Sequence, residues 1–173
     1  MKTALFIIVA LFFVGCSTKQ SPSYNQKVNL EKLPITANVI GPSYRPKNQN
    51  WITLALFNEY KKWYQTPYEY GGVCLEGVDC SSLVQIIYKD AFNITLPRAT
   101  KDQVKVGYEI PRNSTKEGDL VFFKTGYDTR HVGIIIEKGK FINASSKAGV
   151  TISELNNPYW REKYWQSRRV LPY

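Results

Sequence analysis

The sequence predicts an α+β domain, with helices in its first half and an antiparallel β-sheet in its second. Apolar residues recur at helical spacing from Ile52 to Trp63, and a second apolar helix pattern follows Asp79. From Gly118 onward the pattern changes to short β-rich runs separated by turn residues. We therefore expect the second helix to pack on the sheet.

The first residues have the pattern of an export signal. Residues 4–14 form an unbroken apolar run of eleven residues, too short to span a membrane because a spanning helix needs about 20. The run leads into Cys16 and resembles a bacterial lipobox, in which this cysteine becomes lipidated and forms the new N-terminus, although Phe13 stands where leucine is usual. An ordinary signal peptide with an incidental cysteine is the alternative. Both interpretations predict export.

The composition limits the classes of molecule that the protein could bind. The chain has 23 basic and 14 acidic residues and a formal net charge of +9 at pH 7, which favours anionic partners. For an exported protein we exclude nucleic acid, which leaves anionic lipid head groups or the anionic cell-wall polymer, unless the lysines serve solubility alone. We divide the chain into a signal peptide over 1–15, a lipidated N-terminus and flexible tether over 16–50, and one domain over 51–173.

Each expected helix has end signals in the sequence. Asn50 is the expected N-cap of the first helix, and the Gln-Thr-Pro of residues 65–67 ends it. Residues 68–78 contain three glycines and predict a loop. Asp79 then has the place of an N-cap for the second helix.

A third, short helix and the strands follow. Thr100 with Gln103 has the pattern of a capping box at the start of that helix. The β-rich runs are residues 119–123, 131–137, 140–145, 149–155 and 167–171.

Cys80 directly follows the expected cap Asp79. A thiol in the first turn of a helix faces unpaired backbone N–H groups and the positive end of the helix dipole, so we expect its pKa to lie well below the usual value of about 8.5. A small buried helix residue is the alternative. His131 is the only histidine, and imidazole can serve both as base and as proton donor to a leaving amine. A structural histidine is the alternative here.

We expect neither a metal nor a cofactor. Cys74, Cys80 and a single histidine lack the number and spacing of a structural metal site.

Five motifs follow one another along the second part of the chain, at residues 68–72, 79–84, 96–100, 118–123 and 131–134. Their order resembles that of the NlpC-type cell-wall peptidases, which have a papain-like fold. The aromatic and arginine-rich segment 159–169 also resembles the lipoprotein members, and the resemblance covers about residues 51 to 173.

The resemblance implies a role for each matching residue. Cys80 matches the nucleophile and His131 the general base. Asn143 matches the third position, which orients the imidazole and is commonly histidine in this family; an asparagine carbonyl can also accept the imidazole N–H. Tyr68 matches a tyrosine beside the thiol that helps to hold the oxyanion.

The resemblance also implies a substrate-binding group. Asp79 and Ser81, together with Tyr68, match positions that contact the amino end of a short wall peptide. Arg98 matches a family arginine, which we expect to brace the helix that follows it. Cys74 lies outside the pattern, and we interpret it as a neutral replacement, with a regulatory disulfide to Cys80 as the alternative.

One geometric question stays open in the sequence. A hairpin turning at Lys138 and Gly139 does not place Asn143 directly opposite His131. A bulge or strong twist at Gly133 could close the gap.

The family resemblance implies an endopeptidase that cuts γ-D-glutamyl to diamino-acid bonds in peptidoglycan stem peptides by Cys-His-Asn thiol catalysis. A wall-binding lipoprotein that has lost catalysis and an acyl- or amidotransferase are the alternatives. We expect a monomer in the cell envelope, held on the membrane by the lipid on Cys16. Ser17 after the lipidated cysteine favours the outer membrane, with the domain facing the periplasm.

Overall fold

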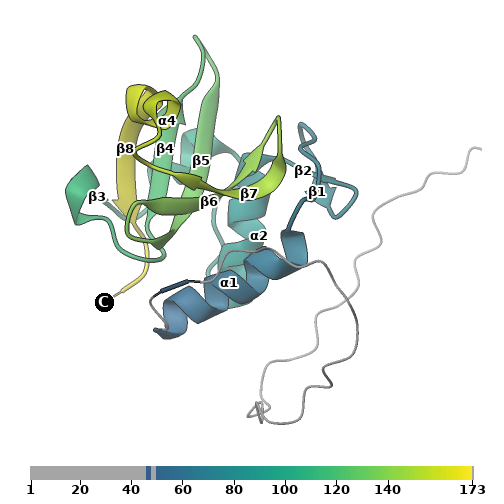
Figure 1. The fold of residues 1–173 in the computed structure, drawn as a ribbon, viewed down its shortest axis with the longest axis horizontal. Helices are drawn as coiled ribbons and strands as arrows, with labels where there is room; N and C mark the ends of the chain where they lie inside the picture. The colour runs from purple at the N-terminus through teal and green to yellow at the C-terminus, as the bar shows by residue number, and fades with distance from the viewer. Residues whose placement is uncertain (1–45, 48–49, 173) are drawn as a thin grey trace, which may run out of the picture. The chain divides into compact units, whose positions relative to one another are not determined.

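A computed structural model describes residues 46–47 and 50–172 of the chain (Figure 1). The signal peptide expected over residues 1–15, the lipidation site Cys16 and most of the expected tether lie outside the described residues. Among the residues described, no helix combines the length and the apolar character that crossing a membrane requires.

The two main helices begin where the sequence predicts. Helix α1 spans Trp51–Trp63, and the side chain of Asn50 accepts a hydrogen bond from the backbone N–H of Thr53 at 2.8 Å. Helix α2 spans Cys80–Phe92, and Oδ1 of Asp79 accepts from the backbone N–H of Ser82 at 2.7 Å. Both N-caps are therefore confirmed, and Asp79 fixes Cys80 as the first residue of its helix.

The capping box expected in the short third helix is wrong. Helix α3 spans Thr100–Gln103, but its N-cap is Ala99, which has no side chain able to cap. The Gln103 side chain instead donates to the carbonyl oxygens of Ser81 and Pro97, each at 2.9 Å. The glutamine thus braces the start of α2 because this buried amide finds its acceptors there.

Six antiparallel strands form the sheet, in the spatial order β3-β8-β4-β5-β6-β7. The α+β class and the helices-first order are confirmed. A small hairpin of β1 (Val73–Cys74) and β2 (Gly77–Val78) lies where a plain loop was expected. The strands are β3 Tyr108–Ile110, β4 Leu120–Lys124, β5 Arg130–Glu137, β6 Lys140–Ser145, β7 Gly149–Glu154 and β8 Tyr164–Arg169.

Three elements have no counterpart in the sequence-based prediction. They are β3, the short 3₁₀ helix Arg112–Ser114 and the short helix α4, Pro158–Lys163. The expected last strand starts earlier than predicted, at Tyr164. Of these elements, α4 matters most for the site.

The sheet separates two apolar clusters, and strand alternation assigns each side chain of β5 to one of them. Val132 and Ile134 belong to the main core, which they share with α1 and α2. Ile135 belongs to a smaller cluster with Phe123, against which Trp160 of α4 packs. Helices α1 and α2 therefore cover one face of the sheet, and α4 lies on the other (Figure 1).

Candidate active site

The Cys80 thiol lies against the sheet at the start of β5. The backbone N–H of Val132, the residue after His131, donates a hydrogen bond to its sulfur. The Thr100 hydroxyl lies 3.9 Å from Sγ. Cys80 is a free thiol, so the alternative disulfide with Cys74 is not formed. The helix start thus places the sulfur against the backbone of β5, directly after the only histidine of the chain.

The expected lowering of the thiol pKa is wrong. Burial raises the pKa of the Cys80 thiol, and the negative charge of Asp79 raises it further. The hydrogen bonds from the Val132 and Ser81 backbone N–H groups and from Thr100 lower it, but they do not outweigh burial. The resting thiol is therefore neutral at pH 7, and the thiolate must form by proton transfer to a base.

His131 is oriented as such a base. Its Nε2 lies 3.2 Å from Oδ1 of Asn143. The Asn143 amide nitrogen donates to Ser153 Oγ at 2.9 Å and to the Thr151 carbonyl at 3.4 Å, which fixes which end of the amide faces the imidazole. Because a carbonyl oxygen can only accept, the imidazole proton lies on Nε2, and Nδ1 is the basic nitrogen.

Burial also sets the charge of the imidazole. It lowers the pKa of His131 to about 4, although the hydrogen bond with Asn143 acts in the opposite direction. The Cys80 thiol, with its raised pKa, and the His131 imidazole, with its lowered pKa, are therefore both neutral at pH 7.

The contact between His131 and Asn143 is diagonal across neighbouring strands. Strand β5 pairs with β6 so that Ile134 faces Ile142, and His131 is not the register partner of Asn143. The register shift lies between Ile135 and Glu137 and not at Gly133, where a bulge or strong twist was one way to close the gap.

Gly133 nonetheless brings the two strands close together. A Cβ atom there would lie 2.5 Å from Phe141 Cδ2 and 2.7 Å from the Ile142 carbonyl oxygen. The glycine therefore allows the close approach that the diagonal contact needs.

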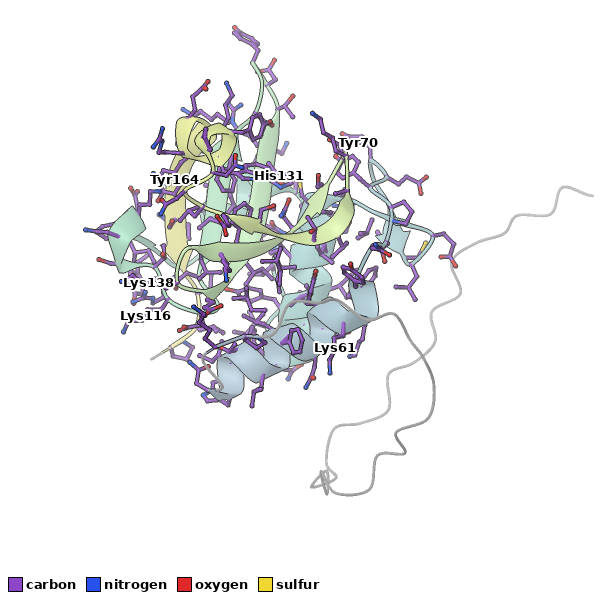
Figure 2. All side chains as sticks on the ribbon, viewed as in Figure 1. Lys61, Tyr70, Lys116, His131, Lys138 and Tyr164 are labelled. Atoms are coloured by element: carbon purple, nitrogen blue, oxygen red, sulfur yellow. The ribbon has the colours of Figure 1, made fainter. Side chains whose placement is uncertain are left out.

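Trp160 covers the face of the imidazole and was not identified from the sequence. Its ring lies 5.1 Å from that of His131, centroid to centroid, at an interplanar angle of 22°. Phe123 of β4 lies 6.2 Å from the same imidazole. Helix α4 holds this indole beside His131, which lies at the upper end of the sheet in Figure 2. The available signal was the aromatic pair at residues 159–160, which the family resemblance included without a role.

Cys80 and Asp79 influence the phenol of Tyr68 electrostatically. Burial raises the pKa of Tyr68, and the ionised form of Cys80 and the Asp79 carboxylate raise it further. The residue is held by a bridge to Val78, which precedes the helix cap. A phenol with a raised pKa remains a hydrogen-bond donor at neutral pH.

Arg98 pairs with the cap of α2 rather than with the helix that follows it, so the expected role is wrong. Its Nη2 lies 2.6 Å from Asp79 Oδ2, and its Nη1 lies 3.1 Å from Oδ1 and 2.9 Å from Ser81 Oγ. Ser81 Oγ and the Gly71 and Ser82 backbone N–H groups also donate to this carboxylate. Asp79 is therefore surrounded by donors from three segments.

This pairing determines the charge of Asp79. Burial alone would raise its pKa, but the hydrogen bonds from Arg98, Ser82 and Ser81 outweigh it and lower the pKa to about 2. Asp79 is ionised at neutral pH, and Arg98 compensates its charge. Whether Asp79 and Ser81 also contact substrate stays a prediction.

No group of three or more His, Cys, Asp or Glu side chains in the described part of the chain could hold a metal ion. The chemistry that the site supports is nucleophilic: a sulfur at a helix start, an imidazole base, an amide that fixes the base and a nearby phenol donor.

These features, on helices packed against an antiparallel sheet, define the class of papain-like thiol hydrolases. The comparison with known proteins gives the family. The family model for NlpC/P60 matches residues 65–169, and the chain belongs to this family. It is a cysteine-type peptidase.

The chain is similar to several curated relatives. It is 37% identical over 172 residues to the probable endopeptidase NlpC of Escherichia coli K12, covering 98% of this chain and 100% of the relative. It is 40% identical over 120 residues to the murein DD-endopeptidase MepS/murein LD-carboxypeptidase of the same organism, covering 69% of this chain and 64% of that protein. It is 41% identical over 119 residues to the γ-DL-glutamyl hydrolase of Bacillus subtilis, covering 67% of this chain but 29% of that protein.

A solved structure supports the fold. The chain superposes on an NlpC/P60 family protein from Bacillus cereus with a TM-score of 0.62 and 33% sequence identity. The match covers 69% of this chain and 40% of that protein, so this chain corresponds to less than half of its length.

Proposed function

We propose that this protein is a peptidoglycan endopeptidase that cleaves the γ-D-glutamyl to diamino-acid bond of stem peptides. The observation that carries the proposal is the contact of His131 Nε2 with Asn143 Oδ1, which leaves Nδ1 as the basic nitrogen, on the residue directly before the Val132 N–H that donates to the Cys80 sulfur. Similarity to endopeptidases and to a γ-DL-glutamyl hydrolase supports the substrate class.

The reaction follows from the neutral resting pair. As the Cys80 sulfur attacks the scissile carbonyl, Nδ1 of His131 takes its proton. Tyr68 donates to the oxyanion of the tetrahedral intermediate. The imidazolium then gives the proton to the leaving amine of the diamino acid, and a water molecule, activated by the same imidazole, releases the acyl group from sulfur.

Asn143 is compatible with catalysis because it does what an orienting residue must do. Its carbonyl accepts from the imidazole, and Ser153 and Thr151 hold its amide. This argues against the alternative of a wall-binding relative without activity. The similarity to a DD-endopeptidase favours one second candidate, cleavage of D,D cross-bridges.

Purified protein tested on a stem tripeptide decides whether the site is catalytic. We expect hydrolysis by the parent and none by Cys80→Ala, which should still fold because the change removes a single sulfur atom from the buried first turn of α2. Labelling of the parent thiol by an active-site-directed electrophile, and loss of that labelling in His131→Ala, separates an activated thiol from a binding protein. An active Cys80→Ala variant rules out the mechanism.

The placement in the cell is part of the same proposal. Lipidation of Cys16 holds the enzyme on the membrane, and Ser17 directs it to the outer membrane, where the domain faces the wall in the periplasm. The net charge of +9 favours approach to the anionic wall polymer. A monomer is sufficient, because all the proposed catalytic groups come from one chain.

A further inference from the structure

Two basic side chains lie on one indole at the end of the sheet where β4 and β5 meet their connecting hairpin. Lys124 ends β4, Arg130 begins β5, and the two residues are register partners. Lys124 Nζ lies 5.0 Å from the centroid of the Trp165 ring, and Arg130 Cζ lies 5.6 Å from it. We call Lys124, Arg130 and Trp165 the basic platform.

The platform lies on the face of the sheet that carries the thiol. Side chains alternate along a strand, so Arg130 points to the same face as Val132. Val132 belongs to the core under α2, and its backbone N–H donates to the Cys80 sulfur. Trp165 packs against that same core. Two residues of a strand span about 7 Å. Arg130 therefore lies about this far along β5 from Val132, whose N–H contacts the thiol.

No carboxylate in the described part of the chain forms an ion pair with the platform. Across residues 50–172, the ion pairs of basic side chains with carboxylates involve neither Lys124 nor Arg130. Arg130 Nη1 lies between 3.2 and 3.4 Å from three carbonyl oxygens of its own hairpin, which fix the guanidinium on one side. Arg98, the basic residue beside the helix cap, is already paired with Asp79.

The position along β5 indicates which part of the substrate meets the platform. In the proposed reaction His131 gives its proton to the leaving amine. The residue that carries this amine therefore lies near the start of β5, where Arg130 directly precedes His131, although their side chains leave the strand on opposite faces. In a wall peptide of the diaminopimelate type, that residue carries a carboxylate that a lysine in its place would lack.

We propose that the basic platform binds a free carboxylate on the diamino acid that leaves as the amine, and so selects peptides in which this carboxylate is present. The inference rests on the proposed function. A guanidinium fixed on one side offers its remaining N–H groups as a fork to a carboxylate, and the ammonium adds a point charge. Both cations lie over the same indole, which directs them to one place on the surface.

The test uses two tripeptides that differ only at this carboxylate, free in one and amidated in the other. For the parent we expect kcat/KM to be on the order of 10- to 100-fold higher for the free acid, from one or two charge-assisted hydrogen bonds. Arg130→Gln and Lys124→Gln should lose this preference through a higher KM for the free acid, with the amidated peptide unchanged. Arg130→Lys should retain part of it, because it keeps the charge but not the fork.

Lys61→Gln is the matched control. Lys61 Nζ also lies over an aromatic ring, 5.3 Å from the Phe57 centroid, but on α1 and well away from His131 in Figure 2. This variant should keep the preference of the parent. Unchanged turnover of the amidated peptide by the platform variants shows that they are folded.

Each other outcome overturns the inference. If the parent cuts both peptides equally well, the platform does not bind this carboxylate, although the proposed function stands. If kcat/KM of the platform variants falls equally for both peptides, the platform has a structural role only. If the parent instead prefers peptides with a free carboxylate on the glutamate, the platform binds the acyl side of the bond that is cut. If the parent cuts neither peptide, the proposed function fails and the inference fails with it.

Discussion

Replacing Asn143 with alanine tests the orientation of the catalytic imidazole. The change removes the carbonyl that lies 3.2 Å from His131 Nε2 and leaves Ser153 without its amide donor. Loss of one buried hydrogen bond is worth about 1 to 3 kcal/mol, which corresponds to about a 5- to 150-fold loss in rate. Since Asn143 acts on the imidazole and not on the substrate, kcat should fall more than KM rises.

Steady-state kinetics on a defined tripeptide measures this effect, and two further variants calibrate it. Ser153→Ala removes a partner that holds the amide but keeps the carbonyl, so we expect a smaller loss, on the order of fivefold. Asn143→His installs the residue common in the family and should be at least as active as the parent. An Asn143→Ala variant as fast as the parent would show that another group orients His131.

Three other predictions concern the imidazole, its cover and the anchor. Trp160→Ala should lower kcat about tenfold, because the indole that stacks on His131 holds and desolvates it, and Trp160→Phe should restore most of the rate; equal rates for all three proteins would refute this role. The free energy of unfolding should fall by up to about 3 kcal/mol between pH 6.5 and about 4, because the unfolded imidazole binds a proton in this range and the native one, with its pKa lowered to about 4, does not. Urea titrations should show this slope in the parent and its loss in His131→Gln, and a slope that persists in the variant contradicts the assignment. Cys16→Ser should abolish incorporation of labelled fatty acid, because the thioether needs sulfur; continued labelling would exclude Cys16 as the lipidation site.

The helix starts could be predicted from the sequence because their signals are local. Asn50 and Asp79 cap α1 and α2 through side-chain bonds to backbone three residues on, and that spacing is visible in the sequence. The position of Cys80 at a helix N-terminus follows from the cap alone.

Other features depend on tertiary contacts that local patterns do not encode. The thiol pKa was expected to be low from the helix start, but burial against β5 outweighs that effect. Gln103 fits a capping box by spacing, yet it finds its acceptors at Ser81 and Pro97. The diagonal contact of His131 with Asn143 depends on a register shift further along β5, between Ile135 and Glu137.

Helix α4 shows the same limit for a short element. At six residues, Pro158–Lys163 gives no helical apolar period, and its place beside the imidazole is set by packing on the outer face of the sheet. An aromatic pair in the sequence therefore could not reveal that Trp160 covers His131.

The bond that is cut tests the central claim most directly. Mass spectrometry of the products from a purified stem tripeptide, treated with the parent protein or with Cys80→Ala, measures it. We expect the parent to release the free diamino acid from the dipeptide that ends in D-glutamate, and the variant to leave the tripeptide intact. Cleavage at any other bond, an intact tripeptide after treatment with the parent, or the same products from both proteins would contradict the account.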